Sequence, residues 1–236
     1  NDRLRAEAKA LQTLADDRDH RIVAFQEAIE LGDYAAFLMR PVFADSENNR
    51  IETLGGRIRK EGRLHIDLLQ RFGEDLIDVV RHLEKKGVSH RDIKPDNIAV
   101  GFASREHVLQ IRAGTIGYLD PMLPLRRPPP RYDSYAERYA VAATLHEMAT
   151  GTLPKWGDGR SDPSQLDAGT EITIDADLFD TDLREKLAHF FQRAFRRDIS
   201  LRFDNAEQML AEWKACFEGM RSIAITDDQD NDDELR

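Results

Sequence analysis

The sequence predicts an α+β fold with a mostly helical large lobe and a smaller part that holds the few strands. Strand-like runs come first along the chain, and amphipathic helical patterns fill most of the rest. A length of 236 residues allows one large domain or two modest lobes. Hydrophobic residues form 41% of the chain and charged residues 33%, which is typical of a globule with a buried core.

The first forty residues predict one helix and two strands. Residues 3–14 repeat Leu and Ala at helical spacing. Two apolar and β-branched runs follow at 20–31 and 33–42, and the turn residues Gly32 and Asp33 separate them. We therefore expect a helix, a strand and a strand in this order.

The rest of the chain predicts several helices and one short strand. The helix at about 66–86 has apolar residues three or four apart on one face, and Gly87 ends it. The helix at 135–151 is apolar on most sides, which is typical of a central helix. The strand is expected at 97–100. Further helices are expected at 53–62, 183–195 and 206–217.

Composition and charge exclude several classes of protein. The single cysteine, Cys216, excludes an intramolecular disulfide and a cysteine zinc cluster, and it favours a reducing compartment such as the cytoplasm. The formal net charge of −10 argues against a nucleic-acid partner, and no apolar run approaches the roughly 18 residues of a membrane span. Residues 223–236 are mostly acidic and predict a disordered tail or linker. Because the chain starts with Asn1 rather than Met, we expect its natural start to lie elsewhere.

The most specific motif is GVSHRDIKPDNIAV at residues 87–100. His90, Arg91 and Asp92 are followed by Asn97 five residues after the aspartate. This spacing resembles the H-R-D-x-x-x-x-N catalytic loop of the eukaryotic-like (Hanks-type) serine/threonine protein kinases. The resemblance implies a bilobal protein-kinase-like fold, with an incomplete small lobe at 1–40 and a large lobe at 41–222.

Phosphoryl transfer gives a chemical reason for these residue types. A carboxylate must take the proton of the acceptor hydroxyl, and Asp92 is placed to be that base. Lys94 can bring positive charge to the transferring phosphate and, by resemblance, indicates Ser/Thr rather than Tyr specificity. Asn97 offers an oxygen to one magnesium ion. The structural alternative is that Asp92 only caps a turn that His90 and Arg91 brace.

Two later segments also resemble the kinase family. GTIGYLDP at 114–121 resembles the end of an activation segment, in which Thr115 would hydrogen-bond the catalytic Asp and Lys, although it could be an ordinary Gly/Pro turn. The helix that ends in EMATG resembles the central helix of the large lobe, but Glu137 replaces its opening Asp. Met122 stands where the family has a Glu that pairs with an Arg, here Arg202. With Met122 opposite Arg202, we therefore expect that this ion pair of the family cannot form.

The start of the chain resembles part of a kinase small lobe. The resemblance places Glu7 where the family keeps the Glu that holds the ATP-contacting Lys. Met39 would guard the adenine pocket, and the backbone from Arg40 to Val42 would bond the adenine. The alternatives are a surface charge for Glu7 and ordinary core packing for Met39.

Several kinase elements are missing from the sequence. No Gly-rich loop and no ATP-contacting Lys precede Glu7, and no Asp occurs between Asp96 and Asp120 to form Asp-Phe-Gly. Sixteen residues separate Asn97 from Gly114, which is too few for a second strand, a metal-binding turn and an activation loop. Either the natural protein has these elements outside the present sequence, which we favour, or the chain is a degenerate pseudokinase.

We expect a serine/threonine kinase domain that uses ATP and Mg²⁺ and acts on protein Ser or Thr, within a polypeptide that can carry further domains. The motifs are most similar to kinase domains of large bacterial proteins, including the phage-growth-limitation (PglW-type) kinases of anti-phage systems. The alternatives are a pseudokinase scaffold and a small-molecule phosphotransferase of the same fold. The latter enzymes generally show H-G-D in place of His90-Arg91-Asp92.

Overall fold

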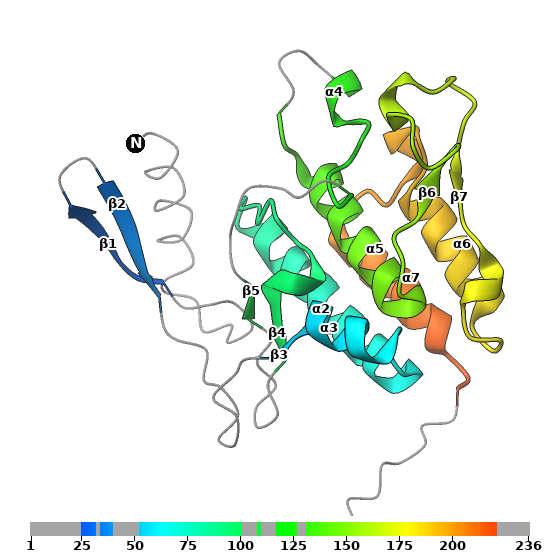
Figure 1. Ribbon diagram of the computed structural model, residues 1–236, viewed down its shortest axis with the longest axis horizontal. Helices are drawn as coiled ribbons and strands as arrows, with labels where there is room; N and C mark the ends of the chain where they lie inside the picture. The colour runs from blue at the N-terminus through cyan, green and yellow to red at the C-terminus, as the bar shows by residue number, and fades with distance from the viewer. Residues whose placement is uncertain are drawn as a thin grey trace, which may run out of the picture.

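The computed structural model describes residues 25–31, 34–39, 52–100, 108–109, 117–126 and 131–220. The strands β1 (Phe25–Leu31) and β2 (Tyr34–Met39) form an antiparallel hairpin, which lies beside the helical body in Figure 1. Both strands fall within the two runs that predicted them. The predicted helix at 3–14 and the acidic residues 223–236 lie outside the described residues.

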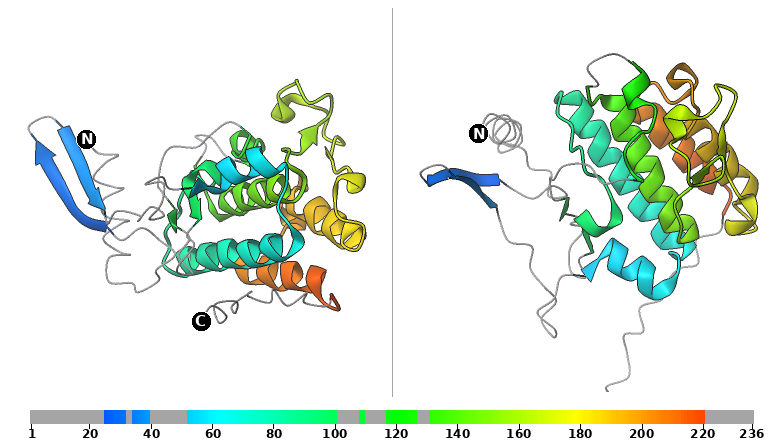
Figure 2. Two further views of the ribbon diagram at one scale, coloured as in Figure 1. Left: turned by 60° about the horizontal axis from the view of Figure 1, so that its bottom comes forward. Right: turned by 45° about the horizontal axis from the view of Figure 1, so that its top comes forward.

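The body consists of helices that pack side by side. Helix α3 contacts both α5 and α7, and α6 contacts α5 and α7. Figure 2 shows this bundle from two further directions. All the helices predicted between residues 53 and 217 are confirmed to within about two residues. Their bounds are α2 (Leu54–Glu61), α3 (Ile66–Lys85), α5 (Ser134–Thr150), α6 (Arg184–Ala194) and α7 (Ala206–Phe217). The short helix α4 (Leu123–Arg126) was not predicted.

Helix α5 is the central helix, as its composition predicted. Nearly every residue from Ala136 to Ala149 is buried, so α5 has no solvent-facing side. The Asp133 side chain caps its start by accepting a hydrogen bond of 2.9 Å from the Ala136 amide. Gly151 ends it in a left-handed conformation with φ of 76°. The remaining helices therefore pack around α5.

In the described part of the chain, three small sheets accompany the helices. Strands β3 (Glu52–Thr53), β4 (Ile98–Val100) and β5 (Val108–Leu109) form one antiparallel sheet in this order. Of these three strands, only β4 was predicted. A second strand after Asn97 takes only two residues, because Val108 and Leu109 suffice for β5 to pair with β4. The expectation that a strand, a metal-binding turn and an activation loop do not all fit before Gly114 concerns residues that mostly lie outside the described part of the chain. Strands β6 (Lys155–Trp156) and β7 (Ile172–Thr173) form the third sheet.

Short 3₁₀ turns complete the described part of the chain. The turn η1 belongs to the catalytic loop, and the other three lie among the segments that follow α5. Their bounds are η1 (Pro95–Asn97), η2 (Pro163–Gln165), η3 (Ala176–Leu178) and η4 (Ile199–Leu201).

Two helix-ending glycines fix the connection between α2 and α3 to the end of α5. A Cβ atom on Gly151 would lie 2.1 Å from the carbonyl oxygen of Gly62, so only glycine fits there. The Leu64 amide also donates a 2.8 Å hydrogen bond to the Met148 carbonyl. The N-terminal end of α3 is thereby held to the central helix. The catalytic loop follows the other end of α3.

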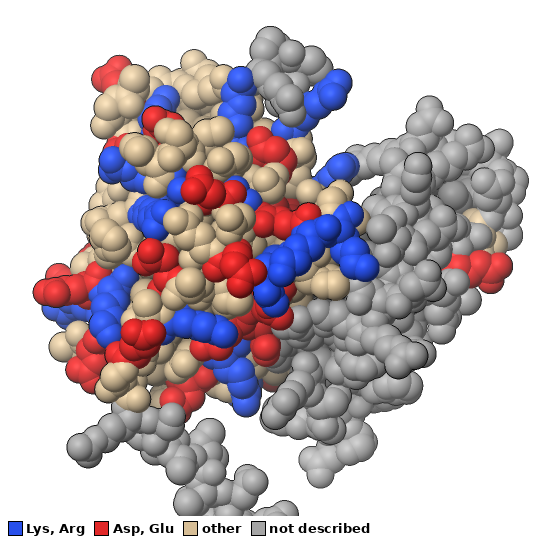
Figure 3. Space-filling model, turned by 180° about the vertical axis from the view of Figure 1, so that it is seen from behind, with Lys and Arg blue, Asp and Glu red and all other residues tan. Residues whose placement is uncertain are grey.

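The surface carries charges of both signs. Over the face seen in Figure 3, Lys and Arg side chains alternate with Asp and Glu side chains rather than forming one broad basic area. Among the described residues, no helix is both long and apolar enough to cross a membrane.

The contact between α3 and α7 depends on a glycine. A Cβ atom on Gly73 would lie 2.4–2.5 Å from atoms of the Trp213 indole ring, which is fully buried. The Trp213 Nε1 also donates a 3.3 Å hydrogen bond to the Gln70 carbonyl. The indole ring therefore lies directly against the backbone of α3, and any larger residue at position 73 must displace it.

We expect Gly73→Ala to lower the free energy of unfolding by about 1–3 kcal/mol, since overpacking outweighs the gain in helix propensity. Gly169→Ala is the control, because no atom lies within 4 Å of its Cβ position and its backbone is not left-handed. Its effect should stay within about 0.5 kcal/mol. Denaturant unfolding of both variants measures this difference, and equal effects would contradict the proposed packing.

Candidate active site

The predicted catalytic loop runs from the end of α3 to β4. Its side chains converge on Asp92, which is almost fully buried. The Asn97 Nδ2 donates hydrogen bonds of 2.7 Å to Asp92 Oδ2 and 2.8 Å to the Asp92 carbonyl. The Lys94 Nζ lies 3.5 Å from Asp92 Oδ2. Three residues that the sequence singled out thus meet at one carboxylate.

The orientation of Asn97 has a chemical consequence. Because its amide nitrogen bonds to Asp92, its amide oxygen is the atom that remains for a cation. An amide oxygen is a hard ligand of the kind that Mg²⁺ accepts. Among the described residues, no group of three or more His, Cys, Asp or Glu could hold a metal ion. Asn97 therefore offers one ligand, and phosphate oxygens and water would have to supply others.

Helix α5 fixes the backbone of the catalytic loop through Glu137. Its carboxylate accepts hydrogen bonds from the amides of His90, at 2.5 Å, and Arg91, at 3.1 Å. Arg91 has a φ of 71°, the only positive value among the described non-glycine residues. Such a conformation costs on the order of 1–3 kcal/mol and persists only where neighbouring groups enforce it. Glu137, noted above as a departure from the family's Asp, reaches the loop and holds this conformation.

The environment of Glu137 opposes its charge. Burial raises the pKa of Glu137, while hydrogen bonds from the Tyr132 hydroxyl and from the Arg91 and His90 amides act in the opposite direction. The Tyr132 pKa is raised by burial and by the nearby Glu137 charge, so the phenol stays protonated. Nothing in the sequence marked Tyr132 as part of the site, since no pattern places it beside Glu137.

The expected loss of an ion pair with Arg202 was wrong, because Asp120 supplies the carboxylate that Met122 lacks. Its Nη1 lies 2.6 Å from Oδ2 of Asp120, and its Nη2 donates to Oδ1 at 3.3 Å. Arg126 also pairs with Asp120, and it pairs with Asp133 at the start of α5. Met122 packs in the core, while its amide donates a 3.0 Å hydrogen bond to Asp120 Oδ1. The turn before α4 thus directs the carboxylate of Asp120, rather than the side chain of Met122, toward Arg202.

The segment that contains Tyr118 is tied to the other end of α5. The Tyr118 hydroxyl donates a hydrogen bond to Glu147 Oε2. Burial raises the pKa of Glu147, and the negative charge of Asp96 raises it further, whereas the bond from Tyr118 lowers it. Gly117 has a φ of 100°, so glycine is favoured at the bend before Tyr118.

Helix α2 approaches the catalytic loop closely. A Cβ atom on Gly55 would lie 2.2 Å from Oδ1 of Asp96, and the Arg59 Nη1 forms an ion pair of 2.8 Å with the same oxygen. Gly55 therefore has a packing role against η1, in keeping with the expectation that it does not bind phosphate. Both charged side chains of this pair are more than half exposed, so the pair itself contributes little to stability.

The remaining predicted site residues lie mostly outside the described part of the chain. Glu7, Arg40, Val42 and Thr115 all belong to undescribed segments. Met39 is the last residue of β2, but its side chain is not described. Their roles therefore stay predictions.

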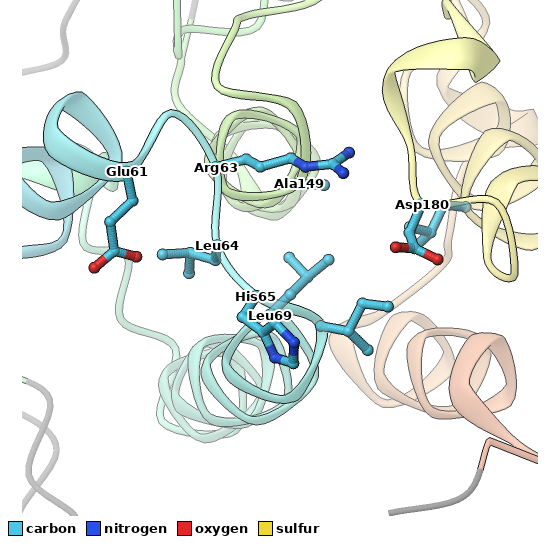
Figure 4. A pocket seen from close by; sticks show the side chains of 9 residues that line it. Glu61, Arg63, Leu64, His65, Leu69, Ala149 and Asp180 are labelled. Carbon is cyan, nitrogen blue, oxygen red and sulfur yellow. The ribbon is translucent and has the colours of Figure 1, made fainter. Parts of the chain in front are cut away.

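A cavity of about 350 Å³ lies elsewhere on the helical body (Figure 4). The connection from α2 to α3, the end of α5, Asp180 and α6 line it. None of Asp92, Lys94 and Asn97 is among its lining residues. The cavity is therefore not part of the predicted catalytic site.

The fold and this loop geometry together define a protein kinase. The family described as Protein kinase domain matches residues 1–213, and the chain belongs to this family. The predicted membership of the Hanks-type kinases is thereby confirmed.

Particular relatives extend the comparison. "Probable kinase PglW" of Streptomyces coelicolor (strain ATCC BAA-471 / A3(2) / M145) is 43% identical over 190 residues, which cover 74% of this chain and 12% of that protein. "Serine/threonine-protein kinase 36" of Mus musculus is 31% identical over 112 residues, which cover 41% of this chain and 8% of that protein. The chain therefore spans only a small part of either relative.

A solved structure confirms the predicted kinase-like fold. The crystal structure of Rad53 1-466 in complex with AMP-PNP matches with a TM-score of 0.65 and 19% sequence identity. The match covers 87% of this chain and 54% of that chain. At this identity the likeness concerns the fold alone.

We expect Asp120→Ala to destabilise the protein by about 3–5 kcal/mol, because it leaves two arginines in the interior without their shared partner. Asp177→Ala is the matched control, since Asp177 forms an ion pair with Arg184 but its side chain is 82% exposed. Its loss should cost less than about 1 kcal/mol. Denaturant unfolding separates the two variants, and a small effect for both would show that the Asp120 network does not stabilise the fold.

Proposed function

We propose that this chain is the phosphoryl-transfer core of a serine/threonine protein kinase that moves the γ-phosphate of ATP to a protein hydroxyl. The observation that carries the proposal is the convergence of Asn97 and Lys94 on the Asp92 carboxylate. Membership of the protein kinase family and the two named kinase relatives support it.

In this proposal Asp92 orients the acceptor hydroxyl and takes its proton late in the transfer. The hydrogen bond from Asn97 fixes one carboxylate oxygen, while the backbone bonds from Glu137 fix the loop that carries Asp92. Lys94 brings a positive charge within 3.5 Å of the same carboxylate, where it can stabilise charge that develops on the phosphoryl group.

The proposed nucleotide is ATP with Mg²⁺. Asn97 would bind one magnesium ion through its amide oxygen, and the ion would neutralise phosphate charge. The solved relative Rad53 is in complex with AMP-PNP, which supports a nucleotide role for the shared fold. We further propose that Thr115 bonds the catalytic residues and that the small-lobe side of the site involves Glu7, Met39, Arg40 and Val42.

We also propose the domain plan and cellular setting that the sequence indicated. Residues 1–40 would be the remnant of the small lobe, 41–222 the large lobe and 223–236 an acidic linker or tail. The protein would act in the cytoplasm on protein substrates, without a direct nucleic-acid or membrane partner. The 43% identity to PglW, of which this chain covers only 12%, supports further domains and a role in anti-phage defence. Loss of phage protection in an Asp92→Asn strain would test the defence role.

We expect Asp92→Asn to lower the rate of phosphate transfer by about 10²–10⁴-fold, because the amide cannot act as the base. Asp182→Asn, at an exposed residue in the connection before α6, is the control and should leave the rate unchanged. Transfer of labelled phosphate from Mg-ATP to protein measures both, and phosphoamino-acid analysis should show phosphoserine or phosphothreonine. Equal rates for wild type and Asp92→Asn would exclude the proposed reaction at this site.

A further inference from the structure

We propose that the cavity of Figure 4 docks protein substrates, and that it takes a short segment in which an apolar residue lies between Lys or Arg residues. The inference rests on the proposed kinase activity, because it concerns how the substrate of that activity is held. The cavity measures about 350 Å³, near the lower end of the range for ligand pockets. A space of this size fits a short extended segment better than a helix, which is about 10 Å wide with its side chains.

The floor of the cavity is apolar, and the fold fixes it before any partner binds. Leu64, Leu69 and Leu187 line the cavity, and each is at most 4% exposed. The Leu64 amide donates its hydrogen bond to the Met148 carbonyl, which holds this part of the floor to α5. An apolar side chain can therefore pack against the leucines without a rearrangement of the protein.

Two carboxylates flank this apolar floor. In Figure 4, Glu61 and Asp180 lie on opposite sides of the leucine side chains. Glu61 Oε1 pairs with Arg57 of the same helix at 3.0 Å, and Asp180 Oδ1 accepts a 3.1 Å hydrogen bond from the Asp182 amide. Among the described residues, the second oxygen of either carboxylate has no donor. A segment with a cation on each side of an apolar residue matches this arrangement.

The surroundings favour a cationic over an anionic partner. Arg63 also lines the cavity, but its Nη1 donates a 2.9 Å hydrogen bond to the Leu178 carbonyl, which ties the α2–α3 connection to η3. Residues 152–183, which connect α5 to α6 and include Asp180, contain eight Asp or Glu residues and two Lys or Arg residues. Seven of these eight acidic residues are exposed. Their combined negative potential attracts a basic segment and repels an acidic one.

Direct binding tests the site without any need for activity. The ligand is the synthetic peptide Gly-Gly-Arg-Leu-Arg-Gly-Gly, and the same peptide with Glu-Leu-Glu or Arg-Ser-Arg at its centre is the control. The Arg-Leu-Arg peptide should bind about tenfold more tightly than either control, since each control lacks the charge or the apolar contact. An NMR titration measures this and should shift the methyl resonances of Leu64, Leu69 and Leu187. Equal binding of the three peptides, or no binding, would overturn the proposal.

A pair of double variants tests the two carboxylates. Glu61→Gln with Asp180→Asn removes both charges but keeps the side-chain shapes, and it should weaken binding of the Arg-Leu-Arg peptide about tenfold. Asp204→Asn with Glu207→Gln is the matched control, because both residues are exposed and neither lines the cavity. Glu207, like Glu61, also pairs with an arginine at 3.0 Å. The control should bind within about twofold of wild type, since its charges are screened at a distance. Equal weakening in both double variants would contradict a specific site.

Enzyme kinetics tests whether the docked segment belongs to a substrate. A serine-containing peptide that the wild-type protein phosphorylates is joined through a glycine–serine linker to Arg-Leu-Arg or to Glu-Leu-Glu. The first should have a KM about tenfold lower with an unchanged kcat, because docking binds the ground state and the transition state equally. The variant with Glu61→Gln and Asp180→Asn should lose this difference. Equal KM values for the two peptides would overturn the substrate role.

Two further outcomes are distinguishable from these. Self-association of the wild-type chain that Glu61→Gln with Asp180→Asn abolishes, measured by sedimentation, would assign the cavity to a second copy and overturn the proposal. If wild type and Asp92→Asn transfer phosphate equally, the proposed function fails. The peptide titration would then still decide whether the cavity takes a basic and apolar segment.

Discussion

The burial of helix α5 is the constraint on which the rest of the structure depends. Because α5 has no solvent-facing side, its polar side chains can find partners only on neighbouring segments, and two of its carboxylates bond to segments that form the site. Glu137 near its start holds the catalytic loop, and Glu147 near its end bonds Tyr118. Gly151 at its end permits the contact with Gly62. One rigid element thus sets the relative positions of loops that are far apart in the sequence.

Two buried carboxylates around α5 are stabilised in different ways. Asp120 sits between the cations Arg126 and Arg202, so opposite charge offsets its loss of water. Glu137 bonds to neutral donors, and removal of one shifts its proton equilibrium rather than leaving a cation unpaired. The Asp120 network therefore mainly affects stability, whereas Glu137 links the fold to the chemistry of Asp92.

The sequence predicted what depends on local pattern. The helices follow from apolar periodicity, and the contacts among Asp92, Lys94 and Asn97 follow from a short motif whose spacing nearly fixes its own geometry. Strands β3, β5, β6 and β7 were missed because two residues carry no periodic signal. The Asp120–Arg202 pair was not predicted, because the motif places Met122 at the position of the family's Glu. The turn before α4, which the sequence does not reveal, brings the Asp120 carboxylate to Arg202 instead. The bonds from the His90 and Arg91 amides to Glu137 depend on tertiary packing in the same way.

The contact of Trp213 with Gly73 has a consequence for the order in which the protein is made. Helix α7 covers part of the apolar face of α3, and its Trp213 follows Gly73 by 140 residues in the sequence. The ribosome therefore makes α7 long after α3. Until α7 leaves the ribosome, α3 and the catalytic loop that follows it lack this part of their core. The nascent chain therefore exposes apolar surface while the residues between Gly73 and Trp213 are made, a period in which chaperones commonly protect growing polypeptides.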